Sequence, residues 1–388
     1  MDFVVVGGGC FGLSTALYLR EAGHTVRLIR PVSTENTAHN DTSRLYRIQQ
    51  SNKAAFWKTA AARSIASMKR RGVDMVECGY VGIARGDSEW SRAQEGGMEG
   101  DVPREYNLGT GVGVDKYYPQ NVDAGYFDVI KWREKMEGIF VSLGGLLVDG
   151  GVKCVRVSEA SMVEVEVDGE EGGIGGDVLK CEKVVIAAGA YVNTIPINFS
   201  DGSVYSGVSG ITLKTQYTLS VFVREEDVKS LPSCTMVYGG PTKGGKDEAE
   251  MDSFYYVPAR FEEGGGRWRA KMGHGKCFEE VVEGRDKGEI DKWFMEGGEN
   301  KERAKRGMRE LWGEFFAGVE PVEIEVVCNG ITTDTEDGEP FFEIVGGGEV
   351  GLVGGCNGYG AKTGDEVGRL MAEKMVVGRV GGMSGRAK

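Results

Sequence analysis

The strongest constraint on this chain is a glycine-rich turn between a short apolar strand and a helix. Residues 2–6 (Asp-Phe-Val-Val-Val) form a β-rich apolar run, and Gly7-Gly8-Gly9-Cys10-Phe11-Gly12 follows it directly. Apolar residues at helical spacing occupy 13–19, and a second apolar run covers 25–29 after Gly23-His24. Strand, G-x-G-x-x-G, helix and strand within about thirty residues is the context of the dinucleotide-binding fingerprint.

Each position of this turn has a distinct expected role. Gly7 makes the tight turn, Gly9 lets the backbone approach a pyrophosphate, and Gly12 lets the helix pack closely on the strand. Cys10 and Phe11 open the helix, whose N-terminal N–H groups and dipole attract the phosphates. The sequence therefore predicts a dinucleotide site at residues 7–12.

Arg30 departs from the usual pattern at the end of the second strand. An acidic residue there would bind a ribose 2′-hydroxyl, whereas an arginine suits a 2′-phosphate, as in NADP. Two interpretations stay open: backbone groups hold the ribose while Arg30 lies on the surface, or the site takes NADP.

Composition excludes several other classes of protein. The formal net charge of −13 argues against binding to nucleic acid, and we find no run of about 18 apolar residues that could cross a membrane. With three histidines and no paired cysteine motif, we expect no metal site. No secretory leader and no Ser-Lys-Leu ending stand out, so we expect a cytoplasmic protein, with a peroxisomal location left open.

Further motifs follow at long intervals. They are Ala38-His39-Asn40-Asp41-Thr42-Ser43-Arg44-Leu45-Tyr46-Arg47, the apolar strand 183–187 ending in Ala188-Gly189, Cys328-Asn329-Gly330-Ile331-Thr332-Thr333-Asp334, and Gly354-Gly355-Cys356-Asn357-Gly358-Tyr359-Gly360-Ala361-Lys362. In this order the motifs resemble the D-amino-acid-oxidase superfamily of flavoproteins, within it monomeric sarcosine oxidase and the N-methyltryptophan, pipecolate, saccharopine and fructosyl-amino-acid oxidases.

The resemblance implies an α/β fold (α+β overall) with two domains. A discontinuous Rossmann-like FAD-binding domain would comprise 1–80, 145–215 and 320–388, and a substrate domain on a mixed, mostly antiparallel sheet would comprise 81–144 and 216–319. A single fingerprint followed by distant pieces suits FAD better than NADP, because NADP domains usually complete themselves locally. Glycine-rich and acidic stretches at 165–177, 239–253, 262–266 and 281–303 predict loops or solvated faces.

The resemblance also implies which residues contact FAD. Besides the first glycine turn and Arg30, they are Thr42, Ser43, Arg44, Cys154, Ala188, Gly189, Gly358, Tyr359, Gly360 and Lys362. Cys154, in the strand 152–157 after the crossover helix 129–143, would lie at the adenine end. Cys328 matches the cysteine that holds the flavin covalently through its 8α-methyl group; the alternative is a buried thiol at the end of the strand 322–327.

Four residues are expected to carry the chemistry. The resemblance implies that Lys271 faces flavin N5 and activates O₂, since a fixed ammonium in a dry site stabilises the anion formed by the first electron. Arg47 and Lys362 would bind a substrate carboxylate from two sides, and Tyr256 would lie beside the substrate. The alternatives are an outward strand lysine, a solvated lysine in the first turn of the helix 363–375, and a tyrosine of the core.

The expected activity is FAD-dependent oxidation of an amino acid or N-alkylated amino acid to an imine, with O₂ reduced to hydrogen peroxide. Gly330 and Tyr359 stand where sarcosine oxidases have tyrosine and histidine, which puts sarcosine in doubt as the substrate. Two alternatives remain: an amine dehydrogenase with another electron acceptor, and a diverged flavin-binding protein without turnover. We expect a monomer whose partners are a small-molecule amine and O₂.

Overall fold

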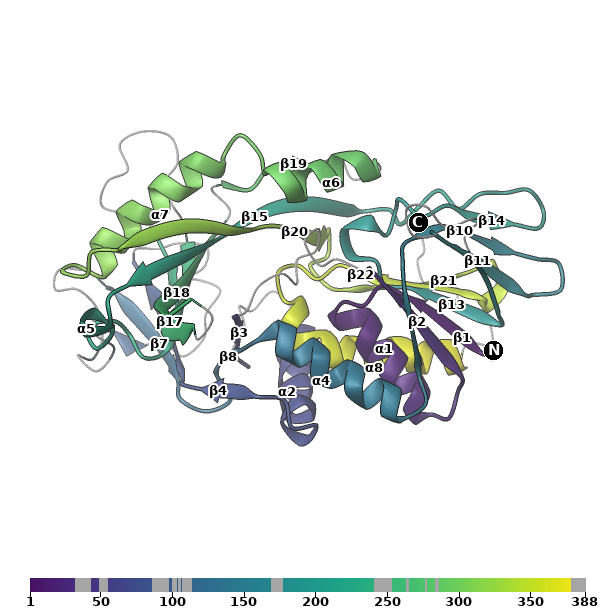
Figure 1. Ribbon diagram of the computed structural model, residues 1–388, viewed down its shortest axis with the longest axis horizontal. Coiled ribbons are helices and arrows are strands. Elements are labelled where there is room, and N and C mark those ends of the chain that lie inside the picture. Colours follow the sequence, from purple (N-terminus) through teal and green to yellow (C-terminus); the bar gives the residue numbers. More distant parts are fainter. Residues whose placement is uncertain are drawn as a thin grey trace.

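The computed structural model describes residues 1–31, 43–48, 55–85, 98–99, 103, 106, 114–168, 177–240, 253–262, 265–275, 278–282 and 286–377, the side chains of 327–329 apart. Two large sheets organise these residues, one toward each end of the long axis (Figure 1).

The first sheet has six strands and is built around the N-terminal strand. Its order is β21 (Phe341–Val345), β22 (Val350–Gly354), β13 (Lys183–Ile186), β1 (Phe3–Val6), β2 (Val26–Arg30) and β9 (Leu146–Asp149). All neighbours are parallel except β21 and β22. The continuous apolar runs of β1 and β13 are explained by burial on both faces of the sheet.

Different layers cover the two faces of this sheet. Val5, Leu28 and Val185 pack among the helices α1 (Cys10–Glu21), α2 (Ala55–Arg70), α4 (Val129–Ser142) and α8 (Gly360–Val377). Their chain neighbours Val4, Ile29 and Val184 face the other way, because alternate strand residues point to opposite faces. There they meet a four-stranded sheet of β12 (Val178–Cys181), β11 (Val163–Val167), β10 (Val152–Val157) and β14 (Ile197–Phe199).

The second large sheet is mixed and mostly antiparallel. Its strands are β5 (Tyr80–Ala84), β6 (Met98–Glu99), β7 (Lys116–Gln120), β15 (Ile211–Val223), β16 (Thr235–Gly239), β17 (Ser253–Glu262), β18 (Arg267–His274), β19 (Val281–Val282) and β20 (Glu323–Thr335). The long strands β15 and β20 run from this sheet toward the first (Figure 1). A small sheet of β3 (Arg44–Tyr46), β8 (Gly125–Phe127) and β4 (Met75–Glu77) lies below them.

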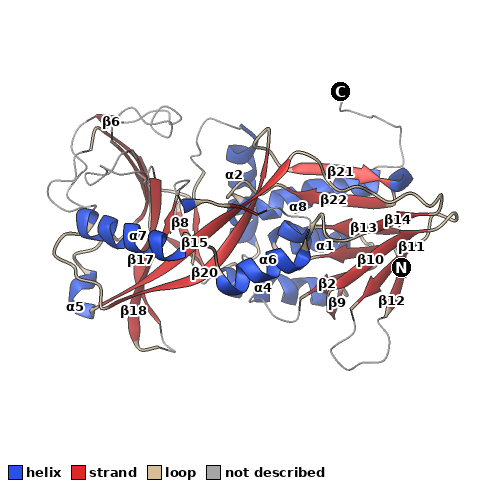
Figure 2. Cartoon of the chain, turned by 90° about the horizontal axis from the view of Figure 1, so that it is seen from above, coloured by secondary structure: helices blue, strands red, loops and turns tan. Residues whose placement is uncertain are grey.

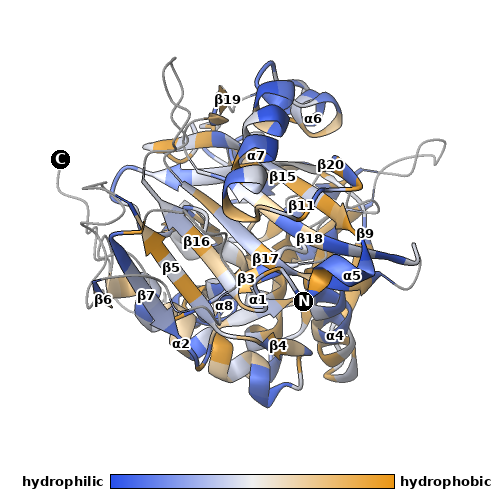
Figure 3. Cartoon of the chain, turned by 90° about the vertical axis from the view of Figure 1, so that its left-hand side faces the viewer, coloured by the Kyte–Doolittle hydropathy of each residue, from blue (hydrophilic) through white to orange (hydrophobic). Residues whose placement is uncertain are grey.

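Helices cover one face of the second sheet. The helices α6 (Lys287–Glu296) and α7 (Lys301–Phe315) lie over β15 and β20 (Figures 1 and 2). Tyr217, Leu219 and Met272 share an apolar core with Trp312 and Phe315 of this layer. The short helix α5 (Glu225–Val228) and parts of α6 and α7 are hydrophilic, whereas β5 is largely apolar (Figure 3).

The predicted fold class is confirmed, with three differences in detail. The helix α6 forms within 281–303, a stretch predicted as loop or solvated face, because Ile290, Trp293 and Phe294 supply a buried stripe among its charges. The strand β20 lies within the predicted FAD-binding domain and pairs with β15, which continues past 215; α4 lies within the predicted substrate domain and packs on α1. The domain limits stay a prediction.

Candidate functional site

The first glycine turn forms a cradle that other residues could not make. Gly7 has φ +110°, and a Cβ there would lie 2.4 Å from the carbonyl oxygen of Ala187. A Cβ on Gly12 would lie 1.9 Å from the carbonyl oxygen of Gly7. Gly9 is the N-cap of α1, whose first turn carries no acidic residue. The N-terminus of a helix whose first turn has no acidic residue fits the pyrophosphate of a dinucleotide.

A second segment approaches the same turn from β13. The N–H of Ala187 donates a hydrogen bond of 2.8 Å to the carbonyl of Val6, so the end of β13 lies beside the end of β1. Ala188 and Gly189 follow, Gly189 with φ +57°, and lead into a short 3₁₀ helix. The end of β13 therefore lies beside the first glycine turn; the passage of 188–189 close to the cofactor stays a prediction.

The last glycine turn completes the arrangement. Asn357 donates its N–H to the carbonyl of Thr333 (3.0 Å), and its side-chain oxygen accepts from the N–H of Thr335 (2.9 Å), so β20 holds the turn before α8. A Cβ on Gly364 would lie 2.5 Å from Cβ of Cys10, so α8 packs directly against the start of α1. Gly358 has φ +76° and Gly360 is the first residue of α8.

The segment 43–47 joins these turns to the second sheet. The ammonium of Lys271, buried on β18, donates a hydrogen bond to the carbonyl oxygen of buried Ser43. Burial raises the pKa of the Cys10 thiol to about 12, and the positive charge of Arg44 partly offsets this rise. The same charge also acts on the thiol of Cys356, whose pKa burial raises. Three motifs distant in sequence therefore meet at Ser43 and Arg44.

Arg47 and Lys362, the predicted carboxylate clamp, are both buried. Their exposed fractions are 7% and 8%. The guanidinium of Arg47 lies 4.4 Å from the ring centroid of Tyr80 and donates a hydrogen bond to its hydroxyl. The ammonium nitrogen of Lys362 lies 4.7 Å from the ring centroid of Tyr359. Burial and the positive charge of Arg47 hold the pKa of Lys362 well below its ordinary value.

Tyr359 is held in place by Trp57. The two rings stack with centroids 5.0 Å apart and an interplanar angle of 30°. The Trp57 indole N–H donates to the carbonyl of Gly338 (2.6 Å), which fixes the indole in turn. The residue in place of the sarcosine-oxidase histidine is thus part of an aromatic wall beside Lys362.

The structure places Tyr256 on the face of the second sheet opposite to that of Lys271. Its hydroxyl donates to the carbonyl of Pro232 (3.1 Å), and its ring packs against Phe316 at 4.9 Å in the core under α7. Its neighbour Tyr255 lies on the side of Lys271, whose ammonium is 5.4 Å from the Tyr255 ring centroid. The Tyr255 hydroxyl also lies 3.4 Å from the hydroxyl of Thr218.

Sequence reasoning missed Tyr255, because the choice between residues 255 and 256 depends on the register of β17 with β18. Tyr255 pairs with Gly273 and Val257 pairs with Lys271, so residues 255 and 257 share the face of the lysine. Residue 256 must then point to the opposite face.

Arg30 is paired with two carboxylates at the end of β2. Its Nε donates to Asp149 at the end of β9 (2.8 Å), and its Nη1 donates to Glu137 on α4. The arginine is half-buried between two carboxylates rather than lying on the surface. Because both carboxylates already compensate its charge, the arrangement does not favour a 2′-phosphate.

Three other predicted residues are placed less directly. The thiol of Cys154 donates to Glu166 (3.5 Å) within the four-stranded sheet. The backbone of Cys328 pairs with Thr218 on β15. Thr218 also pairs with Gly273 of β18, which is two residues from Lys271 in sequence. Thr42 lies outside the described residues. The flavin linkage to Cys328 and the contact of Cys154 with FAD stay predictions.

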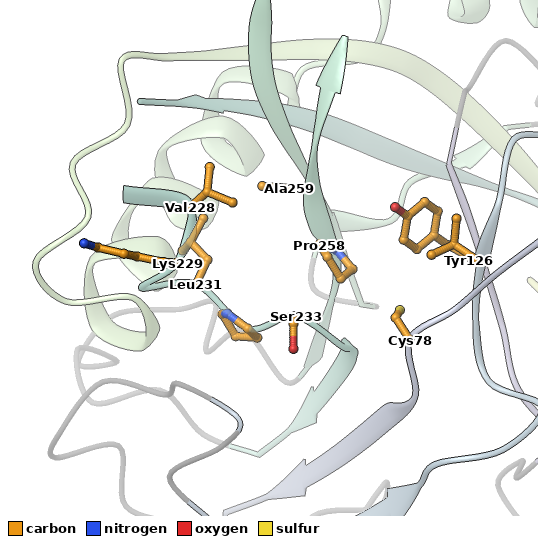
Figure 4. Close-up of a pocket in the computed structure, with 10 residues that line it drawn as sticks. Cys78, Tyr126, Val228, Lys229, Leu231, Ser233, Pro258 and Ala259 are labelled. Atoms are coloured by element: carbon orange, nitrogen blue, oxygen red, sulfur yellow. The ribbon is translucent and has the colours of Figure 1, made fainter. Parts of the chain in front are cut away.

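A pocket of about 320 Å³ opens elsewhere on the molecule (Figure 4). Its lining residues are Val76, Cys78, Tyr126, Val228, Lys229, Leu231, Pro232, Ser233, Pro258 and Ala259. None of the predicted site residues lines it, but Pro232 accepts the hydrogen bond of Tyr256. The pocket is therefore separate from the predicted site residues and is linked to Tyr256 through Pro232.

Two kinds of feature are absent from the described residues. No three or more His, Cys, Asp and Glu side chains gather there in a group that could bind a metal ion. No helix within the described ranges is both long and apolar enough to span a membrane.

Comparisons with known proteins agree with this geometry. The sequence profile of the DAO family, described as FAD dependent oxidoreductase, matches residues 2–374. No curated protein sequence matches the chain.

Solved structures with the same fold cover almost the whole chain. NikD, an amino acid oxidase essential for nikkomycin biosynthesis, has a TM-score of 0.72 at 16% identity, over 99% of this chain and 95% of its own. Fructosamine oxidase from Aspergillus fumigatus (Amadoriase II) has a TM-score of 0.68 at 16% identity, over 98% and 87%. L-proline dehydrogenase from P. horikoshii has a TM-score of 0.67 at 16% identity, over 97% and 93%.

Proposed function

We propose that this chain, which belongs to the family of FAD-dependent oxidoreductases, is an oxidase of α-amino or N-alkylated amino acids. The observation that carries the proposal is the burial of Arg47 and Lys362 side by side next to the dinucleotide cradle. Buried basic groups of this kind are favourable when an anion binds between them. An amino acid or N-alkylated amino acid brings such an anion, its carboxylate, close to the carbon–nitrogen bond that is to be oxidised.

FAD supplies the acceptor for a hydride from the carbon beside the nitrogen, which leaves an imine, and returns the two electrons to O₂ as hydrogen peroxide. Gly7, Gly9 and Gly12, with the N–H groups at the start of α1, would hold its pyrophosphate. Arg44 and the N-terminus of α8 would lie at the ring system, and Cys328 would be the covalent link. Ala188 and Gly189 would pass beside the cofactor.

The chain's own residues orient the substrate. Arg47 offers a planar fork to the carboxylate, and Lys362 approaches as a point charge. Tyr80 supports Arg47 and Tyr359 supports Lys362, so both basic groups keep a fixed position. Fixing the carboxylate fixes the carbon to be oxidised, and positioning of this kind is a large part of catalysis.

Lys271 faces the same space from the second sheet. Its ammonium is buried, with an exposed fraction of 3%, and its bond to the Ser43 carbonyl fixes its position. A fixed cation in a site without water stabilises the negative charge that forms as O₂ accepts its first electron. This placement favours an oxidase over a dehydrogenase.

The shape of the site argues for a substrate other than sarcosine. Tyr359 forms a stacked wall with Trp57. Gly330 stands where sarcosine oxidases have a tyrosine, so it adds no side chain there. The carbonyl of Gly330 accepts a bond from the Trp293 indole (3.3 Å), so α6 holds this part of β20.

Anaerobic mixing of the purified yellow protein with N-methyl, cyclic and N-glycated amino acids tests the function. Bleaching of the flavin near 450 nm by one of these classes, and one hydrogen peroxide per turnover after O₂ is admitted, is the expected result. Bleaching without peroxide would identify a dehydrogenase, and no bleaching by any amino acid would refute catalysis of this reaction. Yellow colour that stays in the acid-precipitated pellet, and moves to the supernatant in Cys328→Ser, tests the covalent link.

A further inference from the structure

Lys362 is a buried basic group, and no acid of the described residues pairs with it. Its exposed fraction is 8%. The groups that act on it are the ring of Tyr359, 4.7 Å from its nitrogen, and the positive charge of Arg47. A cation held away from water beside a second cation is strongly unfavourable.

Only one of the two basic groups can relieve this cost by losing its proton. A guanidinium does not deprotonate in proteins, whereas a lysine does so readily when it is buried. The cost therefore falls on Lys362, and burial beside Arg47 favours its neutral form in the protein without substrate. The lowered pKa of Lys362, caused first by burial and then by the charge of Arg47, agrees with this argument.

The neighbouring acids on α8 are engaged elsewhere. Asp365 accepts a hydrogen bond from Tyr18 (2.7 Å) and lies 3.8 Å from Arg71. Glu366 is bound to Arg63 and Arg369, at 2.7 and 2.6 Å. Both acids face the helices α1 and α2 or the outer side of α8.

Other charged groups around the site are also accounted for. Lys271 donates a hydrogen bond to the carbonyl of Ser43. The positive charge of Arg44 acts to lower the pKa of the thiols of Cys10 and Cys356. Among the described groups, Lys362 is therefore the side chain placed to accept a proton at the carboxylate clamp.

We propose that Lys362 is the proton acceptor of the reaction: it takes the proton from the ammonium of the incoming amino acid and then binds the carboxylate as a cation. The inference rests on the proposed function. One N–H bond of the substrate breaks and one N–H bond forms at Nζ of Lys362, so the total charge is unchanged and no other reactant is needed. The amine becomes neutral, which hydride loss from the adjacent carbon requires.

One side chain can serve both purposes because of the geometry of an α-amino acid. The amine nitrogen and a carboxylate oxygen are attached to neighbouring carbons, within hydrogen-bond distance of each other. A lysine nitrogen beside the carboxylate therefore also reaches the amine. Before transfer it accepts from the ammonium, and after transfer it donates to the carboxylate and lies opposite Arg47.

Proton uptake on binding of a carboxylate tests the charge state of Lys362 without catalysis. Benzoate, which carries no amine, is titrated calorimetrically into the FAD-loaded protein at pH 7 in buffers of different ionisation enthalpy. We expect an uptake of about one proton per benzoate, because the anion restores the charge of the lysine. Lys362→Met should abolish the uptake, and Lys58→Met, at an exposed lysine of α2, should leave it unchanged. No uptake in the unmodified protein would overturn the inference.

Lys362→Arg separates carboxylate binding from proton transfer, since it keeps a cation that cannot accept a proton. In anaerobic stopped flow, we expect flavin reduction by Lys362→Arg to slow at neutral pH and to rise about tenfold per pH unit toward the amine pKa in solution. The unmodified protein should reach its plateau at lower pH. The same pH profile in both proteins would overturn the inference. Failure of the proposed function would look different: no amino acid would bleach the flavin, while benzoate would still cause proton uptake.

Discussion

The ammonium of Lys271 donates a hydrogen bond to the backbone carbonyl of Ser43, a residue 228 positions earlier in the chain. This bond connects the second sheet to the segment that precedes Arg44 and Arg47. The group expected to meet O₂ and the groups expected to bind the substrate are thus positioned by the same contact. The contact joins the second sheet to the segment 43–47, and neither of these two sequence motifs alone predicts that they meet.

Lys271→Met should impair the reaction with O₂ far more than flavin reduction. Loss of one preorganised charge at a developing anion slows such a step about 10²- to 10³-fold. Stopped-flow reoxidation of the reduced protein measures this step directly. Lys180→Met, which removes an exposed strand lysine bound to Glu164 at 3.0 Å, is the control and should reoxidise normally. Equal reoxidation rates in both variants would refute the role of Lys271.

The neighbouring tyrosines of β17 should respond in opposite ways to removal of the hydroxyl. Tyr256→Phe deprives the buried Pro232 carbonyl of its donor, so unfolding should become easier by about 1 kcal/mol with flavin reduction unchanged. Tyr255→Phe changes the face of Lys271 and should alter kcat or KM with little change in stability. Urea unfolding and steady-state kinetics on both variants distinguish the two positions. A kinetic defect confined to Tyr256→Phe would restore the sequence-based assignment.

Two glycine-to-alanine changes in helices should differ sharply. In Gly12→Ala the new Cβ would lie 1.9 Å from the Gly7 carbonyl oxygen, so the cradle must shift and FAD binding should be lost. In Gly138→Ala, within α4, no atom lies within 4 Å of the new Cβ, and unfolding should become harder by up to about 1 kcal/mol. Flavin content and thermal unfolding measure both effects. Retention of FAD by Gly12→Ala would contradict the proposed cradle.

Arg30→Ala should destabilise the fold without creating or removing an NADP site. The change leaves the carboxylate of Glu137, with a side-chain exposed fraction of 10%, without its main partner, at a cost of about 2 kcal/mol. Arg156→Ala removes the exposed pair with Glu166 and should cost much less. Urea unfolding compares the two variants. Binding of NADP to the unmodified protein, lost in Arg30→Ala, would contradict the ion-pair interpretation.

The stability of the protein without substrate should rise with pH through the titration of Lys362. Its pKa in the folded state lies well below the ordinary value of 10.5, so over that window the unfolded chain binds one proton more than the folded chain. The free energy of unfolding then increases with pH until both states are neutral at this group. Lys362→Met should flatten this slope in urea unfolding between neutral and alkaline pH. An unchanged slope in the variant would show that Lys362 is charged in the folded protein.

Local sequence was sufficient to predict the dinucleotide turn, and the resemblance carried by the motifs predicted the fold class. The turn at 7–12 is recognisable because its glycines are needed for contacts between near neighbours, as the Cβ of residue 12 and the carbonyl of residue 7 show. Apolar runs in β1 and β13 likewise predict strands buried on both faces, whatever the rest of the chain does. The order of the motifs then identified the family.

What the tertiary structure alone decided is how distant side chains pair. The carboxylates of Glu137 and Asp149 compensate Arg30 from two other elements, and a one-residue difference in strand phase sends Tyr256 to the core and Tyr255 to Lys271. The unusual acidity of the Lys362 ammonium comes from burial next to Arg47, a residue more than three hundred positions away. Pairing, facing and desolvation depend on neighbours in space, and the linear order of residues does not contain them.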